Sequence, residues 1–181
     1  MPYWLLTSTT YGTWLPGDAR GSVTAVREVR LEQAPRHSRR EHNRFGDPVE
    51  PVIVGLFRSA TDHLKGQPVR LSADQAAVVL RQFIETAEHR SWRLVGAAVM
   101  ANHFHVVVGT RGSEDGRKTL VDLKSYATRA LNRSFGHCAE GRWWTRHGSH
   151  RRLFDERALA AATNYVLNRQ PHVLAKWPQE P

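Results

Sequence analysis

The run Met100-Ala101-Asn102-His103-Phe104-His105-Val106-Val107-Val108 limits the possible folds more than any other part of the chain. Residues 92–100 and 104–108 are rich in apolar side chains, which predicts two strands separated by a turn or kink at Ala101-Asn102. Side chains alternate along a strand, so His103 and His105 point to one face while Phe104 points into the opposite layer. We therefore expect a sheet that presents two adjacent imidazoles on one face.

The rest of the chain supplies further strands and helices for such a sheet. Ser72 and Gln75 form a capping-box pattern before apolar residues at helical spacing, and Asp155 is placed to cap a last helix. The expected order is strand 3–10, helix from 72, strands 92–100 and 104–108, helix 118–133, a strand-like stretch within 143–154, and helix 155–168. This order favours an α+β fold, a ferredoxin-like antiparallel sheet with two helices packed on one face.

A polar, arginine-rich stretch at about 19–50 interrupts this pattern and shows no clear periodicity. We interpret it as a long surface insertion in a single domain that spans residues 1–181. Its arginines Arg36, Arg39, Arg40 and Arg44 fit two interpretations, a solvated loop or a basic arm that becomes ordered on DNA.

Charge indicates the kind of partner. The formal net charge is +9 and the sequence pI is about 10.6, and most of the 26 basic residues are arginine. Arginine binds phosphate through two parallel hydrogen bonds, and the six tryptophans offer platforms on which unpaired bases could stack. Nucleic acid is therefore the expected partner, the alternative being that the charge serves solubility and the tryptophans lie in the core.

Other features of the sequence narrow the protein class. No apolar run is long enough to predict a membrane span, and the N-terminal residues lack the pattern of a signal peptide. Cys138 is the only cysteine, which excludes an internal disulfide and suits a reducing compartment. We expect a cytoplasmic protein associated with the nucleoid.

The two imidazoles of His103 and His105 are suited to holding a divalent metal ion. With ten histidines in the chain, a His-apolar-His triplet also arises by chance. The position after a turn-forming Asn and at the start of an apolar strand favours a metal site. A histidine-triad nucleotide hydrolase would need a third histidine at Val107, which disfavours that alternative.

Tyr126 is the expected nucleophile. It lies on the helix 118–133, away from the centre of the apolar stripe, and shares that flank with Asp122, Arg129 and Arg133. The alternative is a tyrosine that packs at an amphipathic boundary. A tyrosine that attacks phosphorus forms a phosphotyrosine link, and a metal on two histidines would orient the phosphate and offset developing charge. The basic residues expected to bind DNA phosphates are Lys124, Arg129, Arg133, Arg151 and Arg152.

Asn-His-Phe-His followed by Val-Val-Val, and then Lys-Ser-Tyr on the next helix, resembles the single-tyrosine HUH transposases of bacterial insertion sequences. The likeness is greatest to their REP-associated relatives and covers roughly residues 92–168 and the opening strand. It implies Mg²⁺ or Mn²⁺ on the histidines and single-stranded or hairpin DNA as substrate. It also implies cleavage that leaves a 5′-phosphotyrosine and a free 3′-hydroxyl. Residues 165–168, Tyr-Val-Leu-Asn, resemble the Tyr-Ile-x-x-Asn-Pro element of the family's last helix, with Arg169 where proline is common.

One position departs from the family pattern. Members often carry a third metal ligand, such as Gln, one helical turn after the tyrosine, where this chain has Ala130. Asp122 or a substrate phosphate oxygen could replace it, and His63, His147 and His150 are further candidates. Two alternatives to the tyrosine enzyme therefore stay open: a non-catalytic nucleic-acid-binding module, and a nuclease that uses water. The sequence leaves open a monomer or a homodimer.

Overall fold

The structure, a computed structural model, describes residues 1–19, 27–28, 39–40, 53–112 and 115–178. Its contacts divide the chain into two compact units, residues 1–13 with 67–181, and residues 14–66. The predicted insertion at about 19–50 belongs to the second unit, and most of it, including Arg36 and Arg44, lies outside the described residues. That residues 1–181 act as a single domain stays a prediction.

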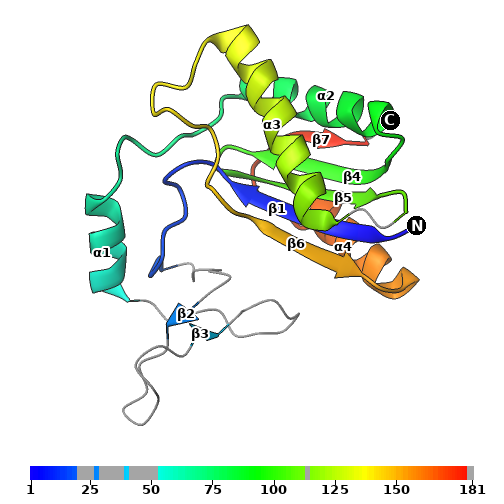
Figure 1. Ribbon diagram of the computed structural model, residues 1–181, viewed down its shortest axis with the longest axis horizontal. Coiled ribbons are helices and arrows are strands. Elements are labelled where there is room, and N and C mark those ends of the chain that lie inside the picture. Colours follow the sequence, from blue (N-terminus) through cyan, green and yellow to red (C-terminus); the bar gives the residue numbers. More distant parts are fainter. Residues whose placement is uncertain (20–26, 29–38, 41–52, 113–114, 179–181) are drawn as a thin grey trace. The chain divides into compact units, whose positions relative to one another are not determined.

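The larger unit is built on a five-stranded antiparallel sheet (Figure 1). Its strands are β1 (Tyr3–Thr9), β4 (Arg93–Met100), β5 (His103–Gly109), β6 (Ser149–Leu153) and β7 (Val173–Trp177). They lie in the order β6-β1-β5-β4-β7, and the first four have the order and connections of a ferredoxin-like fold. The predicted fold class is confirmed, whereas β7, at the edge next to β4, was not predicted.

Helices α2 (Ala73–His89) and α3 (Gly116–Phe135) pack on one face of the sheet, as expected. The capping box is present: the Ser72 hydroxyl accepts from the Gln75 amide, and the Gln75 side chain accepts from the Ser72 amide. Phe104 of β5 points into this layer, and its ring lies 4.8 Å from that of Phe83. The main core therefore fills the space between this face and the two helices.

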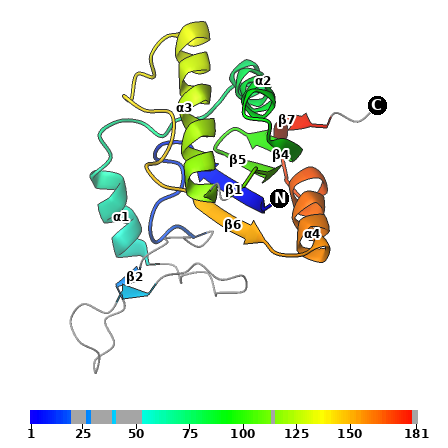
Figure 2. The same ribbon diagram turned by 45° about the vertical axis from the view of Figure 1, so that its right-hand side comes forward.

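Helix α4 (Glu156–Asn168) covers the opposite face (Figure 2). Asp155 caps it, since its carboxylate accepts from the Ala158 amide at 2.7 Å. Ala162 and Val166 are buried against Val107 of β5 in a second apolar cluster. Strand β5 runs parallel to β6, and β6 runs parallel to β7. The chain moves toward one edge of the sheet on going from β5 to β6, and toward the other edge on going from β6 to β7. Right-handed crossovers therefore place α3 and α4 on different faces.

In the smaller unit, β2 (Arg27–Glu28) pairs antiparallel with β3 (Arg39–Arg40). Helix α1 (Val54–Asp62) follows, and none of its residues is buried. Over the described ranges of both units, no helix has the length and hydropathy needed to cross a membrane.

Candidate active site

His103 and His105 lie next to each other on β5, as the alternation of the strand predicts. Their ring centroids are 5.0 Å apart and the ring planes are 82° from parallel. Both belong to the face that α4 covers, because Val107, two residues beyond His105, packs against that helix. His105 is 7% exposed and His103 is half-buried.

Each imidazole is held through the same ring nitrogen. Thr7 of β1 stands directly opposite His105, and its Oγ1 lies 2.7 Å from His105 Nδ1. The side-chain oxygen of Asn102 lies 2.7 Å from His103 Nδ1. Nε2 of His105 is therefore the nitrogen of that ring left for a ligand. This pattern matches metal-binding histidines, whose second nitrogen is usually held by a neighbouring oxygen.

Burial, and secondarily the nearby His103, lower the pKa of His105 to about 3. The His105 ring is therefore neutral near pH 7 and keeps a lone pair that a metal ion could accept. The chemistry of these donors fits two ligands of a divalent ion.

Tyr165 of α4 is the tyrosine that meets the histidines. Its ring centroid lies 5.3 Å from that of His105, with the planes at 70°. Burial of Ala162 and Val166 orients α4 so that Tyr165, one residue before Val166, sits at the border of the packed stripe and is 44% exposed. The Tyr165 side chain is therefore partly open to solvent beside the imidazole of His105.

The structure does not bring Tyr126 to this place, and its role as nucleophile stays a prediction. Tyr126 lies on α3, on the other face of the sheet, and the guanidinium groups of two arginines lie near its ring. The Cζ atoms of Arg129 and Arg90 lie 5.2 Å and 6.0 Å from its ring centroid. Its surroundings are those of a side chain that ties α3 to the end of α2.

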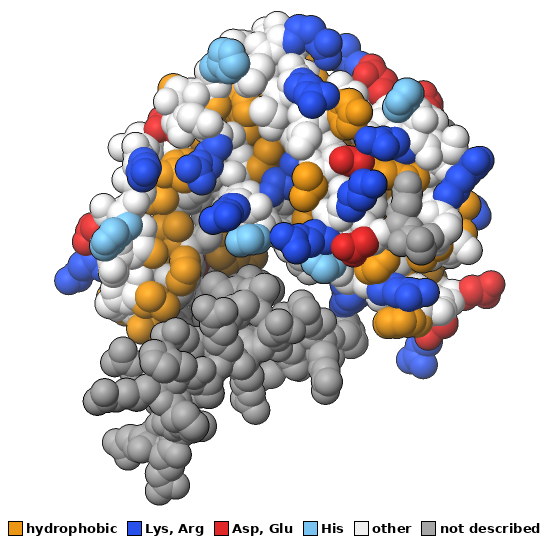
Figure 3. Space-filling model, viewed as in Figure 1, with side chains coloured by type: hydrophobic (Ala, Val, Ile, Leu, Met, Phe, Trp, Pro, Cys, Tyr) orange, Lys and Arg blue, Asp and Glu red, His pale blue; other side chains and the backbone are white. Residues whose placement is uncertain are grey.

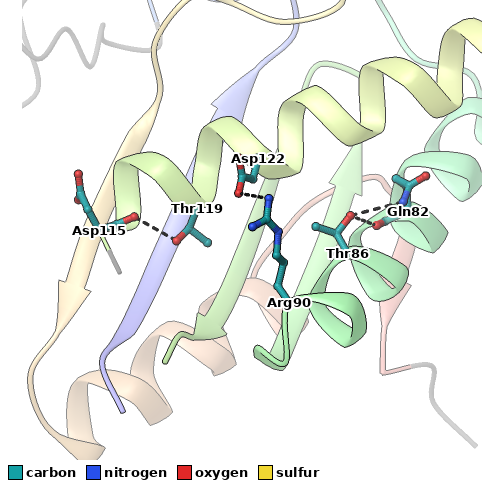
Figure 4. Close-up of polar contacts among 6 residues, drawn as sticks. All are labelled: Gln82, Thr86, Arg90, Asp115, Thr119 and Asp122. Atoms are coloured by element: carbon teal, nitrogen blue, oxygen red, sulfur yellow. Dashed lines mark hydrogen bonds and ion pairs between the residues drawn. The ribbon is translucent and has the colours of Figure 1, made fainter. Parts of the chain in front are cut away.

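Asp122, predicted as a possible third ligand, also belongs to the helix on the other face of the sheet. Asp122 of α3 forms an ion pair of 2.9 Å with Arg90 (Figure 4), and Ala130 is buried in the α3 layer. His150 stands opposite Leu6 and shares its face, away from His105, and His63 belongs to the smaller unit. Within the described part of the chain, no three or more His, Cys, Asp or Glu side chains form a group that could hold a metal. The described residues therefore offer no third His, Cys, Asp or Glu ligand to an ion on His103 and His105.

Lys124, expected on DNA, has other partners. Its ammonium donates to the carbonyl of Thr145 at 2.6 Å and to that of His147 at 3.1 Å. Burial lowers the pKa of Lys124 to about 8. Lys124 therefore fastens the segment that leads into β6 onto α3.

The remaining arginines expected on DNA divide between the two faces. Arg129 and Arg133 are exposed on α3. Lys and Arg side chains are spread over the face of the molecule that Figure 3 shows. Arg152 stands opposite Trp4, whose side chain belongs to the α2–α3 core, and its Cζ lies 5.3 Å from the Phe154 ring centroid. Arg151 stands opposite Leu5 and therefore shares the face of His105. Arg151 is the only one of these four placed on the face of the sheet that carries the histidines.

Two residues of this arrangement were not predicted to act, Thr7 and Tyr165. Residues 165–168 resemble an element of the family's last helix, but that resemblance assigned no role to Tyr165. Nothing in the sequence singled out Thr7, since only the pairing of β1 with β5 brings it to His105.

Comparisons with known proteins complete the description. No protein-family model and no curated protein match the sequence. Among solved structures, the chain is similar to a REP-associated tyrosine transposase bound to a REP hairpin, with a TM-score of 0.49 and 9% identity. The match covers 91% of this chain and 64% of that one, so this chain spans less than two thirds of the length of the matched protein.

Proposed function

We propose that this protein is a metal-dependent enzyme that nicks single-stranded or hairpin DNA and transfers the strand through a 5′-phosphotyrosine on Tyr165. The observation that carries the proposal is the position of the Tyr165 ring, 5.3 Å from that of His105 and partly open to solvent. Two imidazoles beside a tyrosine supply a metal site and a nucleophile at one point of the fold. The proposal keeps the chemistry of the single-tyrosine HUH transposases that the motifs resemble and moves the nucleophile from Tyr126 to Tyr165.

In the proposed step, the Tyr165 hydroxyl oxygen attacks the scissile phosphorus and loses its proton to solvent. The bond from phosphorus to the 3′ oxygen breaks, and that oxygen takes up a proton to become a free 3′-hydroxyl. The covalent link preserves the bond energy, so attack by a 3′-hydroxyl reverses the step and joins strands. A divalent ion held by His103 and His105 would polarise the phosphate and offset charge in the transition state.

The donors favour Mn²⁺ over Mg²⁺. Mg²⁺ prefers six oxygen ligands in octahedral geometry, whereas Mn²⁺ accepts imidazole nitrogen more readily. His103, His105 and Tyr165 come from one chain, so the proposed site needs no residue from a second copy. The net charge of +9 supports DNA as the partner.

A second candidate function is a DNA-binding module without catalysis. The observation that favours it is the small ligand set, because the described residues offer no group of three or more His, Cys, Asp or Glu to a metal. Such a protein would bind hairpin DNA through its arginines and leave it intact.

The test is to incubate the protein with end-labelled hairpin and single-stranded DNA and Mn²⁺, and to look for an adduct that survives denaturation. We expect an adduct with the unmodified protein and with Tyr126→Phe, and none with Tyr165→Phe. Tyr126→Phe is the matched control, since it removes the same hydroxyl from the other face of the sheet. Adduct formation by Tyr165→Phe would overturn the assignment. Cutting without an adduct would indicate a water nucleophile, and DNA binding without cutting would support the second candidate.

A further inference from the structure

We infer that Thr7 is a positioning residue that fixes the tautomer of His105 and so presents the Nε2 lone pair of that ring to the site. Asn102 does the same for His103. The inference concerns the metal-free protein, and only its consequence for catalysis rests on the proposed function.

The two histidines share one pattern of hydrogen bonding. A neutral imidazole carries a proton on one nitrogen and a lone pair on the other, so the partner of Nδ1 decides what Nε2 offers. The amide oxygen of Asn102, 2.7 Å from His103 Nδ1, can only accept, and therefore Nδ1 carries the proton and Nε2 the lone pair.

Thr7 has the same relation to His105 from a different strand. The register of β1 against β5 places Thr7 opposite His105, and its hydroxyl oxygen lies 2.7 Å from Nδ1. In the described part of the chain, this is the one hydrogen bond that the His105 side chain makes. A hydroxyl can accept from Nδ1 or donate to it, unlike the amide oxygen of Asn102. The inference is that the Thr7 hydroxyl accepts, which leaves the lone pair on Nε2 in a ring that is 7% exposed and has little water to compete for it.

Thr9 provides a matched control on the same strand and face. It stands opposite His103, but its hydroxyl lies 3.1 Å from the hydroxyl of Thr145 rather than on an imidazole. If threonine is present at these positions only because it favours β-strands, replacing Thr7 and replacing Thr9 should have the same effect. A positioning residue would matter at Thr7 only.

The decisive measurement is long-range ¹H–¹⁵N NMR of the histidine rings in the metal-free protein, at a pH where both rings are neutral. We expect the Nδ1–H tautomer for His105 and His103 in the unmodified protein. Thr7→Val, which keeps the shape and removes the hydroxyl, should populate both tautomers of His105, whereas Thr7→Ser and Thr9→Val should not. A dominant Nε2–H tautomer in the unmodified protein, or an unchanged ring in Thr7→Val, would overturn the inference. Because the unmodified spectrum alone can do so, the test stands even if a variant misfolds.

Metal titration adds the functional consequence. Loss of the partner that orients a ligating histidine typically weakens metal binding about 10–100-fold. We expect a loss of that size in Mn²⁺ affinity for Thr7→Val, restoration of most of the affinity in Thr7→Ser, and no change in Thr9→Val. Equal affinity of Thr7→Val and the unmodified protein would count against Thr7. If the unmodified protein binds no Mn²⁺, the proposed function fails, and the tautomer assignment is still decided by the metal-free spectra.

Discussion

The ring of Tyr165 lies 5.3 Å from that of His105, on the opposite face of the sheet from the helix that carries Tyr126. This relationship makes the packing of α4 part of the site, because Tyr165 reaches the histidines only while Ala162 and Val166 seat the helix on the sheet. Small shifts of a catalytic group can lower a rate about 100-fold without unfolding a protein. The packing contacts between α4 and the sheet should therefore affect the rate of the proposed reaction, although they do not touch the substrate.

We predict that Ala162→Leu, at a position of α4 that is 2% exposed, strongly reduces adduct formation while lowering the free energy of unfolding only moderately. Overpacking a core position costs about 1–3 kcal/mol, and here it would also lift Tyr165 away from His105. Ala127→Leu is the control, since Ala127 is 0% exposed under α3 on the other face. It should cost similar free energy of unfolding and leave adduct formation by the folded protein nearly unchanged. Equal losses of activity in the two variants would show that α4 does not set the geometry.

A second prediction concerns acid. The pKa of His105 is about 3 in the folded protein and near 6.5 when unfolded, so the unfolded chain binds more protons between these values. The contribution of His105 to stability is therefore fully present above pH 6.5 and is lost as pH falls toward 3. The loss is at most about 1.4 kcal/mol per pH unit. Urea unfolding from pH 7 to pH 4 should show a shallower pH dependence for His105→Gln than for the unmodified protein. His137→Gln, at an exposed position, should keep the original slope.

The sequence was sufficient to predict which side chains share a strand face and insufficient to predict which helix meets them. A period of two placed His103 and His105 together and Phe104 opposite, and the structure agrees. Helices α3 and α4 both have an apolar stripe and a tyrosine beside it, so periodicity alone does not separate Tyr126 from Tyr165.

The strand connections decide which face of the sheet carries Tyr126 and which carries Tyr165. The strand that the sequence did not predict, β7, was needed to place α4. Its residues Val173–Trp177 form a short edge strand that lacks a clear alternating pattern. Once β7 is known to lie beside β4, the right-handed crossover from β6 puts α4 on the face of the histidines. The contact of Thr7 with His105 could not be predicted for a similar reason, because the two residues are 98 positions apart in the chain.

A third prediction tests whether Asp122 binds the metal ion or only pairs with Arg90. Asp122 is bound to Arg90 at 2.9 Å, so Asp122→Asn should leave Mn²⁺ affinity and adduct formation unchanged. The pair is partly exposed, and its loss should lower the free energy of unfolding by about 1 kcal/mol or less. Mn²⁺ titration and urea unfolding of this one variant decide the matter. Weaker Mn²⁺ binding by Asp122→Asn would restore the carboxylate to the metal site and contradict the observed separation.

The fourth prediction tests whether DNA binds on the face of the sheet covered by α4 or on the face covered by α2 and α3. Arg151 and Arg152 are adjacent in β6 and carry equal charge, but the pairing with Leu5 and Trp4 turns them to opposite faces. Leu5 is two residues from Thr7 on the same strand, so Arg151 stands on the face where Tyr165 and His105 meet. A phosphate bound by Arg151 would lie on the same face of the sheet as the phosphate that Tyr165 would attack.

We therefore expect Arg151→Gln to reduce adduct formation strongly and to flatten the salt dependence of single-strand affinity. One lost phosphate contact should change the log–log slope by about 0.7. Arg152→Gln removes the same charge one residue away, where Arg152 lies over Phe154, and should change both quantities little. Arg133→Gln on α3 extends the control to an exposed arginine of the far face. If Arg152→Gln or Arg133→Gln lowers adduct formation as much as Arg151→Gln, the DNA path does not follow the α4 face. The substrate would then have to approach from the α3 side, and the case for Tyr165 would lose its geometric basis.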